Sequence, residues 1–159
     1  MPDLKMNQPI RFYRVQDLYG EFSNFSPHPI RLKNAEWPTT EHYFQAQKFA
    51  GTEHEEEVRL AASPMIAARM GRARSRPLRK DWEQVKEEIM REALRAKFTQ
   101  HFELRELLLS TGELPLVEHT KNDRYWGDGG DGNGRNRLGA LLMELRASLA
   151  ADSPMHHST

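Results

Sequence analysis

The chain has 159 residues, equal numbers of basic and acidic side chains at 23 each, and no cysteine. The lack of cysteine excludes disulfides, thiolate nucleophiles and cysteine-ligated metal centres. The balanced charge provides no global field that would draw the chain to nucleic acid or a membrane, so any phosphate recognition must be local.

The length fits one domain, which we place at residues 10–150. The ends at 1–9 and 151–159 are polar and without pattern, and we expect both to be flexible. The first residues lack the pattern of a signal peptide, and no apolar run approaches the roughly 20 residues of a membrane span. These features predict a cytoplasmic protein that does not enter a membrane.

The first third of the chain is predicted to hold short strands and an ordered loop. Alternation predicts a strand at residues 10–14, and the mixture of Gly, Ser, Asn, Pro and aromatics at 19–29 predicts a loop. Residues 30–33 and 35–37, interrupted at Asn34, are typical of a hairpin.

Helices are predicted to dominate the remainder. Pro38 and Thr39 open a helix that we expect to reach about Phe49, and Ser63 with Pro64 opens another. Apolar periodicity and breakers bound the full set of predicted helices: 39–49, 53–60, 64–71, 81–99, 102–110 and 135–149. A short strand is expected at 116–118. The result is an α+β fold, a mostly helical single domain with a small β-sheet, and not a doubly wound parallel sheet.

A polar stripe on the helix at 39–49 is the first candidate site. At about 100° per residue, Glu41, Gln45 and Lys48 lie within about 60° of one another, with Phe44 and Phe49 on either side. A carboxylate, an amide and an amine between aromatic walls are typical of a pocket. Such a carboxylate can stabilise the positive charge that develops on a sugar when a base leaves, or activate water. The alternative is a solvated Glu–Lys face with the aromatics in the core.

A basic run follows, with six cations in twelve residues. They are Arg69, Arg72, Arg74, Arg76, Arg79 and Lys80. Arginine pairs with phosphate through a planar fork of donors, so one or two of these side chains, Arg72 among them, are expected to hold a sugar phosphate. The alternative is that most of them are solvated or lie favourably at a helix C-terminus.

The third candidate is the loop at residues 122–137, which carries five glycines between Gly127 and Gly134 and runs into the last helix. Repeated glycine permits turns whose N–H groups converge on an anion, which makes Gly127 and Gly129 candidate contacts. Asp128 is a candidate to polarise water or bind ribose hydroxyls, and Trp126 offers a stacking face for a base. A plain flexible turn is the alternative.

Metal and cofactor chemistry are not expected. The seven histidines are scattered, and we interpret His42 and His119 as packing or hydrogen-bonding residues instead of metal ligands. No motif of a serine hydrolase or of a zinc protease is present. We therefore predict an enzyme without metal or cofactor.

Five long blocks together resemble the NADAR family. They are YGEFSNFSPHPIR at 19–31, WPTTEHYFQAQKF at 37–49, SPMIAARMGRARSRPLRKDW at 63–82, LRAKFTQHFELRELLLSTG at 94–112 and LVEHTKNDRYWGDGGDGNGRNRLG at 116–139. The resemblance covers nearly the whole chain. It points to the branch of bacterial N-glycosidases that act on riboflavin-biosynthesis intermediates.

The resemblance implies a substrate and two site residues. The substrates would be 2,5-diamino-6-hydroxy-4-(5-phosphoribosylamino)pyrimidine and 5-amino-6-(5-phosphoribosylamino)uracil, hydrolysed to ribose 5-phosphate and the free aminopyrimidine. Family-essential glutamate and tryptophan match Glu41 and Trp82. The family blocks also include Trp126, Asp128, Asn122 and Lys48, whose roles are matched less directly.

Together these features predict a metal-free hydrolysis of a small-molecule substrate, in a pocket walled by the Glu41 helix, the Trp82 region and the glycine-rich loop. Glu41 would stabilise the oxocarbenium-like state and activate water, with assistance from Asp128. Trp82 and Trp126 would hold the base. Lys48 could instead trap the sugar carbon as an imine.

Two other functions stay open at this stage. Relatives in the family remove ADP-ribose from guanine in nucleic acid, although the balanced charge disfavours a large nucleic-acid footprint. The other is a non-catalytic ADP-ribose or nucleotide-binding module. The sequence predicts neither the oligomeric state nor the stereochemical course.

Overall fold

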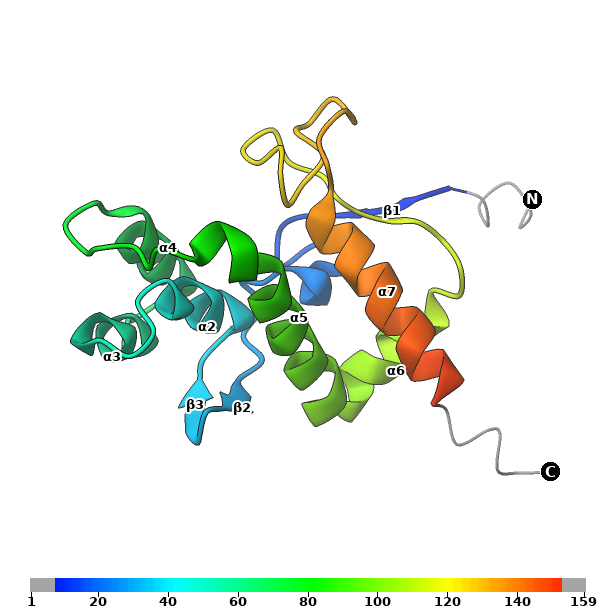
Figure 1. Ribbon diagram of the computed structural model, residues 1–159. Coiled ribbons are helices and arrows are strands. Elements are labelled where there is room, and N and C mark those ends of the chain that lie inside the picture. The colour runs from blue at the N-terminus through cyan, green and yellow to red at the C-terminus, as the bar shows by residue number, and fades with distance from the viewer. Residues whose placement is uncertain (1–7, 153–159) are drawn as a thin grey trace. The chain divides into compact units, whose positions relative to one another are not determined.

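The computed structural model describes residues 8–152, which form two compact units. One unit is Asn24–His101, and the other combines the segments on either side of it. Figure 1 shows the elements and labels most of them. Most of the two ends predicted to be flexible, 1–9 and 151–159, lies outside the described residues. Ala151, which is described, belongs to helix α7.

The unit Asn24–His101 is a helical cluster with one hairpin. Its elements are β2 (Ile30–Leu32), β3 (Ala35–Trp37), α2 (Thr40–Gln47), α3 (Glu53–Arg59), α4 (Pro64–Arg72) and α5 (Trp82–Gln100). Helix α2 packs against α3, α4 and α5 (Figure 1), and every residue of α2 is buried. The centre of this unit is therefore a helix without a solvated face.

Local signals determine where these elements begin. In the antiparallel β2–β3 hairpin, Lys33 and Asn34 both have positive φ, at 56° and 60°, as a two-residue type I′ turn requires. The Thr39 side chain accepts from the backbone N–H of His42, and that of Ser63 accepts from Ile66. Both predicted N-caps are thus confirmed. Helix α2 ends at Gln47, two residues earlier than expected, with Lys48 as its C-cap.

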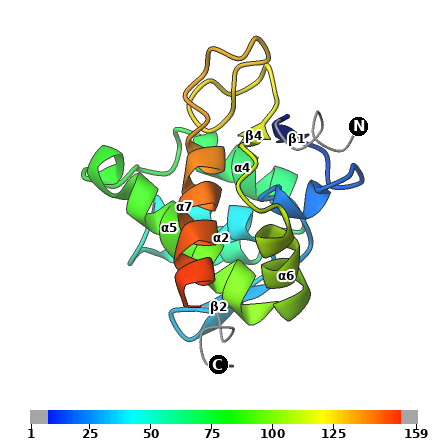
Figure 2. The same ribbon diagram turned by 90° about the vertical axis from the view of Figure 1, so that its right-hand side faces the viewer.

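The second unit joins segments that are far apart in the sequence. Strand β1 (Ile10–Phe12) pairs in parallel with β4 (Leu116–Glu118), with Ile10 opposite Leu116, and Figure 2 shows the two strands side by side. A 3₁₀ turn, η1 (Gly20–Phe22), falls within the predicted loop. Helices α6 (Phe102–Ser110) and α7 (Arg137–Ala151) complete the unit and contact each other.

The fold class is confirmed as α+β: the described residues contain six α-helices and two separate two-stranded sheets. Helix α7 begins at Arg137 instead of Arg135. The N–H groups of Arg135 and Asn136 donate to Arg124 and Gly127 in the preceding loop, and Asn136 itself is left-handed. The loop therefore extends two residues into the predicted helix. No helix within residues 8–152 combines the length and apolar character needed to cross a bilayer.

Candidate functional site

The polar stripe of α2 lies inside the protein. Glu41 is 8% exposed and Gln45 is 7% exposed, and Lys48 is half-buried at the end of the helix. The solvated Glu–Lys face that the sequence left open is therefore wrong. A buried carboxylate, amide and amine need partners, and those partners determine what the stripe can do.

Glu41 occupies the first turn of α2, where the helix dipole favours a negative charge. Its backbone N–H donates to the carbonyl of Asn24 at 3.1 Å, and the hydroxyl of the preceding Thr40 donates to the Asn24 side chain at 2.8 Å. One turn later, Gln45 Nε2 donates to Glu41 Oε2 at 2.8 Å. The carboxylate is thus anchored through both its backbone and its side chain.

Lys48 is the cation of the stripe. Its Nζ donates to the carbonyl of Gly71 at 3.3 Å and lies 5.8 Å from the centre of the Trp82 ring. Burial lowers the pKa of Lys48, and Arg72 lowers it further, while the charge of Glu41 acts in the opposite direction. Because the neutral amine is the nucleophilic form, this environment favours the imine chemistry considered for Lys48.

Trp82 begins α5 and lies against the stripe. Its ring is 5.0 Å from that of Phe44, tilted by 59°, and is 5% exposed. The structure therefore brings Glu41, Gln45, Lys48 and Trp82 into one neighbourhood. Since so little of the Trp82 ring is exposed, a base can stack on its face only if the Lys48 ammonium or a neighbouring side chain moves.

Some arginines of the basic run pair with other side chains of the protein, and others are exposed and could contact a phosphate. Arg76 pairs with Glu57 at 3.1 Å, and Arg79 pairs with Asp81 at 2.6 Å and donates to the carbonyl of Gln47. The guanidinium groups of those two arginines are already paired within the unit. Arg72, the last residue of α4, is exposed and close enough to lower the Lys48 pKa. Of the run, Arg72 best retains the predicted role of contacting phosphate.

In the other unit, the glycine-rich loop is organised around Asp128. The Asp128 carboxylate is 4% exposed and accepts from His119 Nδ1 at 2.8 Å, from Gly130 N at 2.8 Å and from Thr120 N at 3.1 Å. Burial by itself would raise the pKa of Asp128, but these hydrogen bonds together hold it below its ordinary value. The anion on which the loop donors converge is therefore its own carboxylate.

This arrangement bears on the other residues predicted in the loop. The Gly129 N–H donates to the carbonyl of Asp123. This donor is therefore already used, whereas the predicted anion-binding turn needs it to face a bound anion. Gly127 is buried, and a Cβ there would lie 2.7 Å from Thr120 Cγ2. Its glycine thus has a packing reason. Contacts of Gly127, Gly129 and Asp128 with a substrate stay predictions.

Two further loop residues keep accessible surface. The half-buried Trp126 ring packs edge-to-face against Tyr125 at 4.9 Å, and the exposed Asn122 donates to the Tyr13 hydroxyl at 3.2 Å. The stacking of a base on Trp126 and the contact of Asn122 with the substrate also stay predictions.

The histidines lie where hydrogen bonding explains them. Buried His42 contacts the Thr39 hydroxyl through Nδ1 at 2.9 Å and donates from Nε2 to the carbonyl of Ala61 at 3.0 Å. Burial lowers the pKa of His42, which suits a neutral ring. The prediction of hydrogen-bonding roles for His42 and His119 is confirmed. Residues 8–152 contain no group of three or more His, Cys, Asp or Glu side chains that could hold a metal ion.

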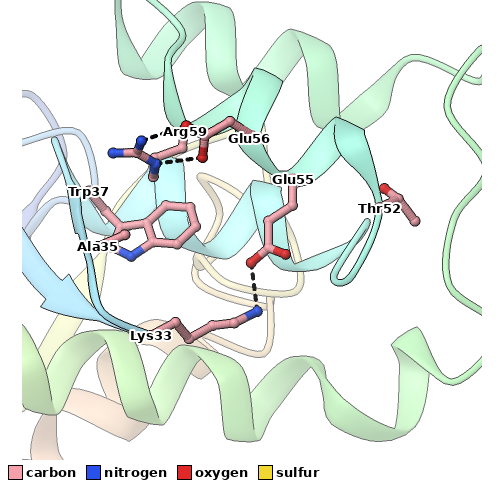
Figure 3. A pocket seen from close by; sticks show the side chains of 7 residues that line it. All are labelled: Lys33, Ala35, Trp37, Thr52, Glu55, Glu56 and Arg59. Atoms are coloured by element: carbon pink, nitrogen blue, oxygen red, sulfur yellow. Dashed lines mark hydrogen bonds and ion pairs between the residues drawn. The ribbon is translucent and has the colours of Figure 1, made fainter.

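A pocket of about 250 Å³ lies in the unit Asn24–His101 and is lined by none of the stripe residues (Figure 3). Seven residues line it: Lys33, Ala35, Trp37, Thr52, Glu55, Glu56 and Arg59. Its charges pair with one another, Lys33 with Glu55 at 2.6 Å and Arg59 with Glu56 at 2.6 Å. The Lys33–Glu55 pair connects the hairpin to α3, as does the donation of Arg59 to the carbonyl of Glu36 at 2.9 Å, so the pocket has a structural explanation without a ligand.

The sequence pattern did not single out Gly71 or the His119–Asp128 contact. For Gly71 no signal existed in the sequence, because a glycine at the predicted end of a helix is an ordinary stop signal, and only the structure shows α4 continuing to Arg72. For His119, nine residues separate it from Asp128 across an irregular loop, and no periodicity predicts such a contact.

Comparison with known proteins identifies the family. The family model of the NADAR domain matches residues 11–150. The chain belongs to the NADAR family. The resemblance predicted from its motifs is thus confirmed, and the NADAR match runs through both compact units.

Three NADAR relatives illustrate the similarity. "N-glycosidase YbiA" of Escherichia coli is 64% identical over 143 residues, covering 90% of this chain and 89% of the relative. "N-glycosidase Npun_R5314" of Nostoc punctiforme is 48% identical, covering 88% and 92%. The maize "Riboflavin biosynthesis protein PYRR, chloroplastic" is 42% identical over 91% of this chain, which corresponds to 26% of the maize protein.

The NADAR fold is also seen in a solved structure. The NMR structure of E. coli YbiA matches with a TM-score of 0.85 at 62% identity, covering 92% of this chain and 87% of that chain.

Proposed function

We propose that this chain is an N-glycosidase that hydrolyses the bond between a ribose 5-phosphate and an aminopyrimidine. The substrates are the riboflavin intermediates named above, 2,5-diamino-6-hydroxy-4-(5-phosphoribosylamino)pyrimidine and 5-amino-6-(5-phosphoribosylamino)uracil. The observation that carries the proposal is the buried Glu41 carboxylate, held by Gln45 beside Lys48 and Trp82. The names of two relatives, which state N-glycosidase, support the reaction class, and the maize name supports the riboflavin link.

In the proposed reaction, the C1′–N bond breaks and positive charge develops on the ribose ring. The Glu41 carboxylate stabilises that charge and accepts a proton from the attacking water. The base nitrogen leaves with the bonding electron pair and gains a proton, so the products are ribose 5-phosphate and the free aminopyrimidine. Arg72 lies at the end of α4, where a guanidinium suits the 5′-phosphate.

Lys48 supplies a second route from the same side chains. Its amine, whose pKa is lowered by burial, attacks C1′ as the C1′–N bond to the base breaks, and the base leaves with the bonding electron pair and gains a proton. The attached amine loses a proton to Glu41, the ring oxygen takes up a proton as the sugar opens to an imine, and water then hydrolyses the imine to ribose 5-phosphate and the free lysine. Both routes need Glu41, either as the group that activates water or as the acceptor of the proton from the amine. The two differ in whether a covalent adduct forms.

The test is to incubate the purified protein with each phosphoribosylamino-pyrimidine and measure release of ribose 5-phosphate. We expect wild-type turnover and a loss of about 100-fold or more in Glu41→Gln, because a general acid–base group contributes about 10²–10⁴-fold. Thermal melting of the variant controls for folding. Equal rates in the two proteins would refute the role of Glu41.

A parallel assay with ADP-ribosylated guanine in DNA or RNA separates the proposal from its family alternative. A clear preference for the nucleic-acid adduct would overturn the proposed substrate while leaving the bond class intact. Tight ligand binding without turnover of either substrate would instead identify a binding module.

A further inference from the structure

Gly71 lies near the end of α4 and faces two side chains of the polar stripe. Its carbonyl accepts from Lys48 Nζ at 3.3 Å. Its other face is filled by Gln45: a Cβ built on Gly71 would overlap Oε1 of the amide and lie 2.7 Å from its Cδ. The space that a side chain of residue 71 would occupy is therefore taken by the amide of Gln45.

The backbone gives no reason for glycine at this position. Gly71 is inside a helix and is not among the residues with positive φ, so any L-residue could adopt its conformation. Glycine also weakens a helix relative to alanine. The need for glycine comes from the close approach of Gln45.

The orientation of the Gln45 amide is determined by Glu41. Gln45 Nε2 donates to Glu41 Oε2 at 2.8 Å, while Gln45 Oε1 is buried and has no hydrogen-bond partner among the described residues. Turning the amide over would place its oxygen against the carboxylate, with two acceptors facing each other. In this orientation the Gln45 amide donates to Glu41 while its buried oxygen lacks a hydrogen bond, which costs free energy. The hydrogen bond to Glu41 is the interaction that offsets this cost.

We propose that Gly71 and Gln45 form a positioning pair for Glu41, an inference that rests on the proposed function. The missing side chain at residue 71 lets the Gln45 amide approach α4 closely enough to direct its N–H at the carboxylate. Gln45 acts through Glu41, because its oxygen is shielded and its nitrogen is used. The stripe at Glu41, Gln45 and Lys48 predicts Gln45 as a substrate-binding residue, and the inference gives it a role through Glu41 instead.

The first test is Gly71→Ala, which adds only a Cβ and keeps the carbonyl that Lys48 contacts. The variant should fold and melt close to the wild type, because the obstructed atoms are the end of a flexible side chain and alanine favours the helix. Its kcat should fall by about 10- to 100-fold, the value of a hydrogen bond to a charged group. KM should change by less than about threefold, since no substrate contact is removed.

The control is a double-mutant cycle with Gln45→Ala. Once the amide is gone, a Cβ at residue 71 has nothing to displace, so G71A/Q45A should have the kcat of Q45A alone. Losses that multiply would show that residue 71 acts independently of Gln45 and would overturn the pair. If G71A melts markedly lower, the proposal requires G71A/Q45A to recover the melting temperature of Q45A.

An NMR measurement separates this inference from the proposed function. The side-chain amide resonance of Gln45, assigned by its loss in Q45A, should shift in Glu41→Ala and shift similarly in G71A. If the wild type releases no ribose 5-phosphate, the proposed function fails while this resonance still reports on the pair. An unmoved resonance in G71A would overturn the positioning role, as would wild-type kcat in that variant.

Discussion

Replacing Asp128 with asparagine separates a role in organising the loop from a role in catalysis. The carboxylate accepts three hydrogen bonds: Oδ1 from the N–H groups of Thr120 and Gly130, and Oδ2 from His119 Nδ1. Asparagine keeps an oxygen for the two backbone donors. Its amide nitrogen faces His119, which must then change tautomer and accept a hydrogen bond instead of donating one.

The magnitude follows from the three bonds. A hydrogen bond to a charged acceptor contributes about 1.5–3 kcal/mol and a neutral one about 0.5–1.5 kcal/mol, so Asp128→Asn should lose about 1 kcal/mol per bond and ~3 kcal/mol in total. Asp128→Ala leaves two N–H groups without their acceptor, at about 1–3 kcal/mol each, and should destabilise the loop at least as much.

The effect depends on pH with a defined sign. The folded-state pKa of Asp128 is lowered by its three donors, so its stabilisation is complete above the unfolded value of about 3.9 and is lost as the pH falls through the folded pKa. The part of the stability difference between wild type and Asp128→Asn that comes from the carboxylate should therefore shrink below about pH 4.

Native-state hydrogen exchange of peptides spanning residues 119–136 measures this local stability, and ribose 5-phosphate release measures activity on the same samples. Asp131→Asn is the matched control, because Asp131 lies in the same loop but is exposed. Faster exchange in Asp128→Asn than in Asp131→Asn supports the organising role. Unchanged exchange with lost activity would refute it and favour the predicted direct role of Asp128 in the reaction.

Two further predictions concern the stripe. Borohydride added during turnover should reduce the imine and leave a sugar phosphate attached to Lys48. The adduct should be detected by peptide mass and should be absent in Lys48→Met. A wild-type protein without any adduct would exclude the imine route and leave water activation by Glu41. Trp82→Phe should raise KM by about threefold to tenfold if a base stacks on this ring, since a stacked base is worth about 1–3 kcal/mol when the aromatic is fully removed. The phenylalanine variant is needed because removing a buried tryptophan entirely costs about 3–5 kcal/mol of stability, and an unchanged KM would assign Trp82 to packing alone.

Features that depend on neighbours in the sequence were predictable. The caps at Thr39 and Ser63 and the break at Asn34 come from hydrogen bonds or backbone angles within four residues, and the structure confirms them. The Glu41–Gln45–Lys48 stripe was predictable for the same reason, because helical geometry alone places these residues together. The sequence also left two interpretations of that stripe, and only the packing of three helices around α2 excluded the solvated one.

The sequence by itself determined which segments are helices, where the capped ones begin and which polar side chains share a face, because each of these follows from local geometry. Only the tertiary structure decided that β1 pairs with β4 across more than a hundred residues, that Gly71 makes room for Gln45, and that the loop donors converge on Asp128. Each of those contacts joins residues that come together only when the helices and strands of their unit pack. The spacing of residues along the sequence does not predict such contacts.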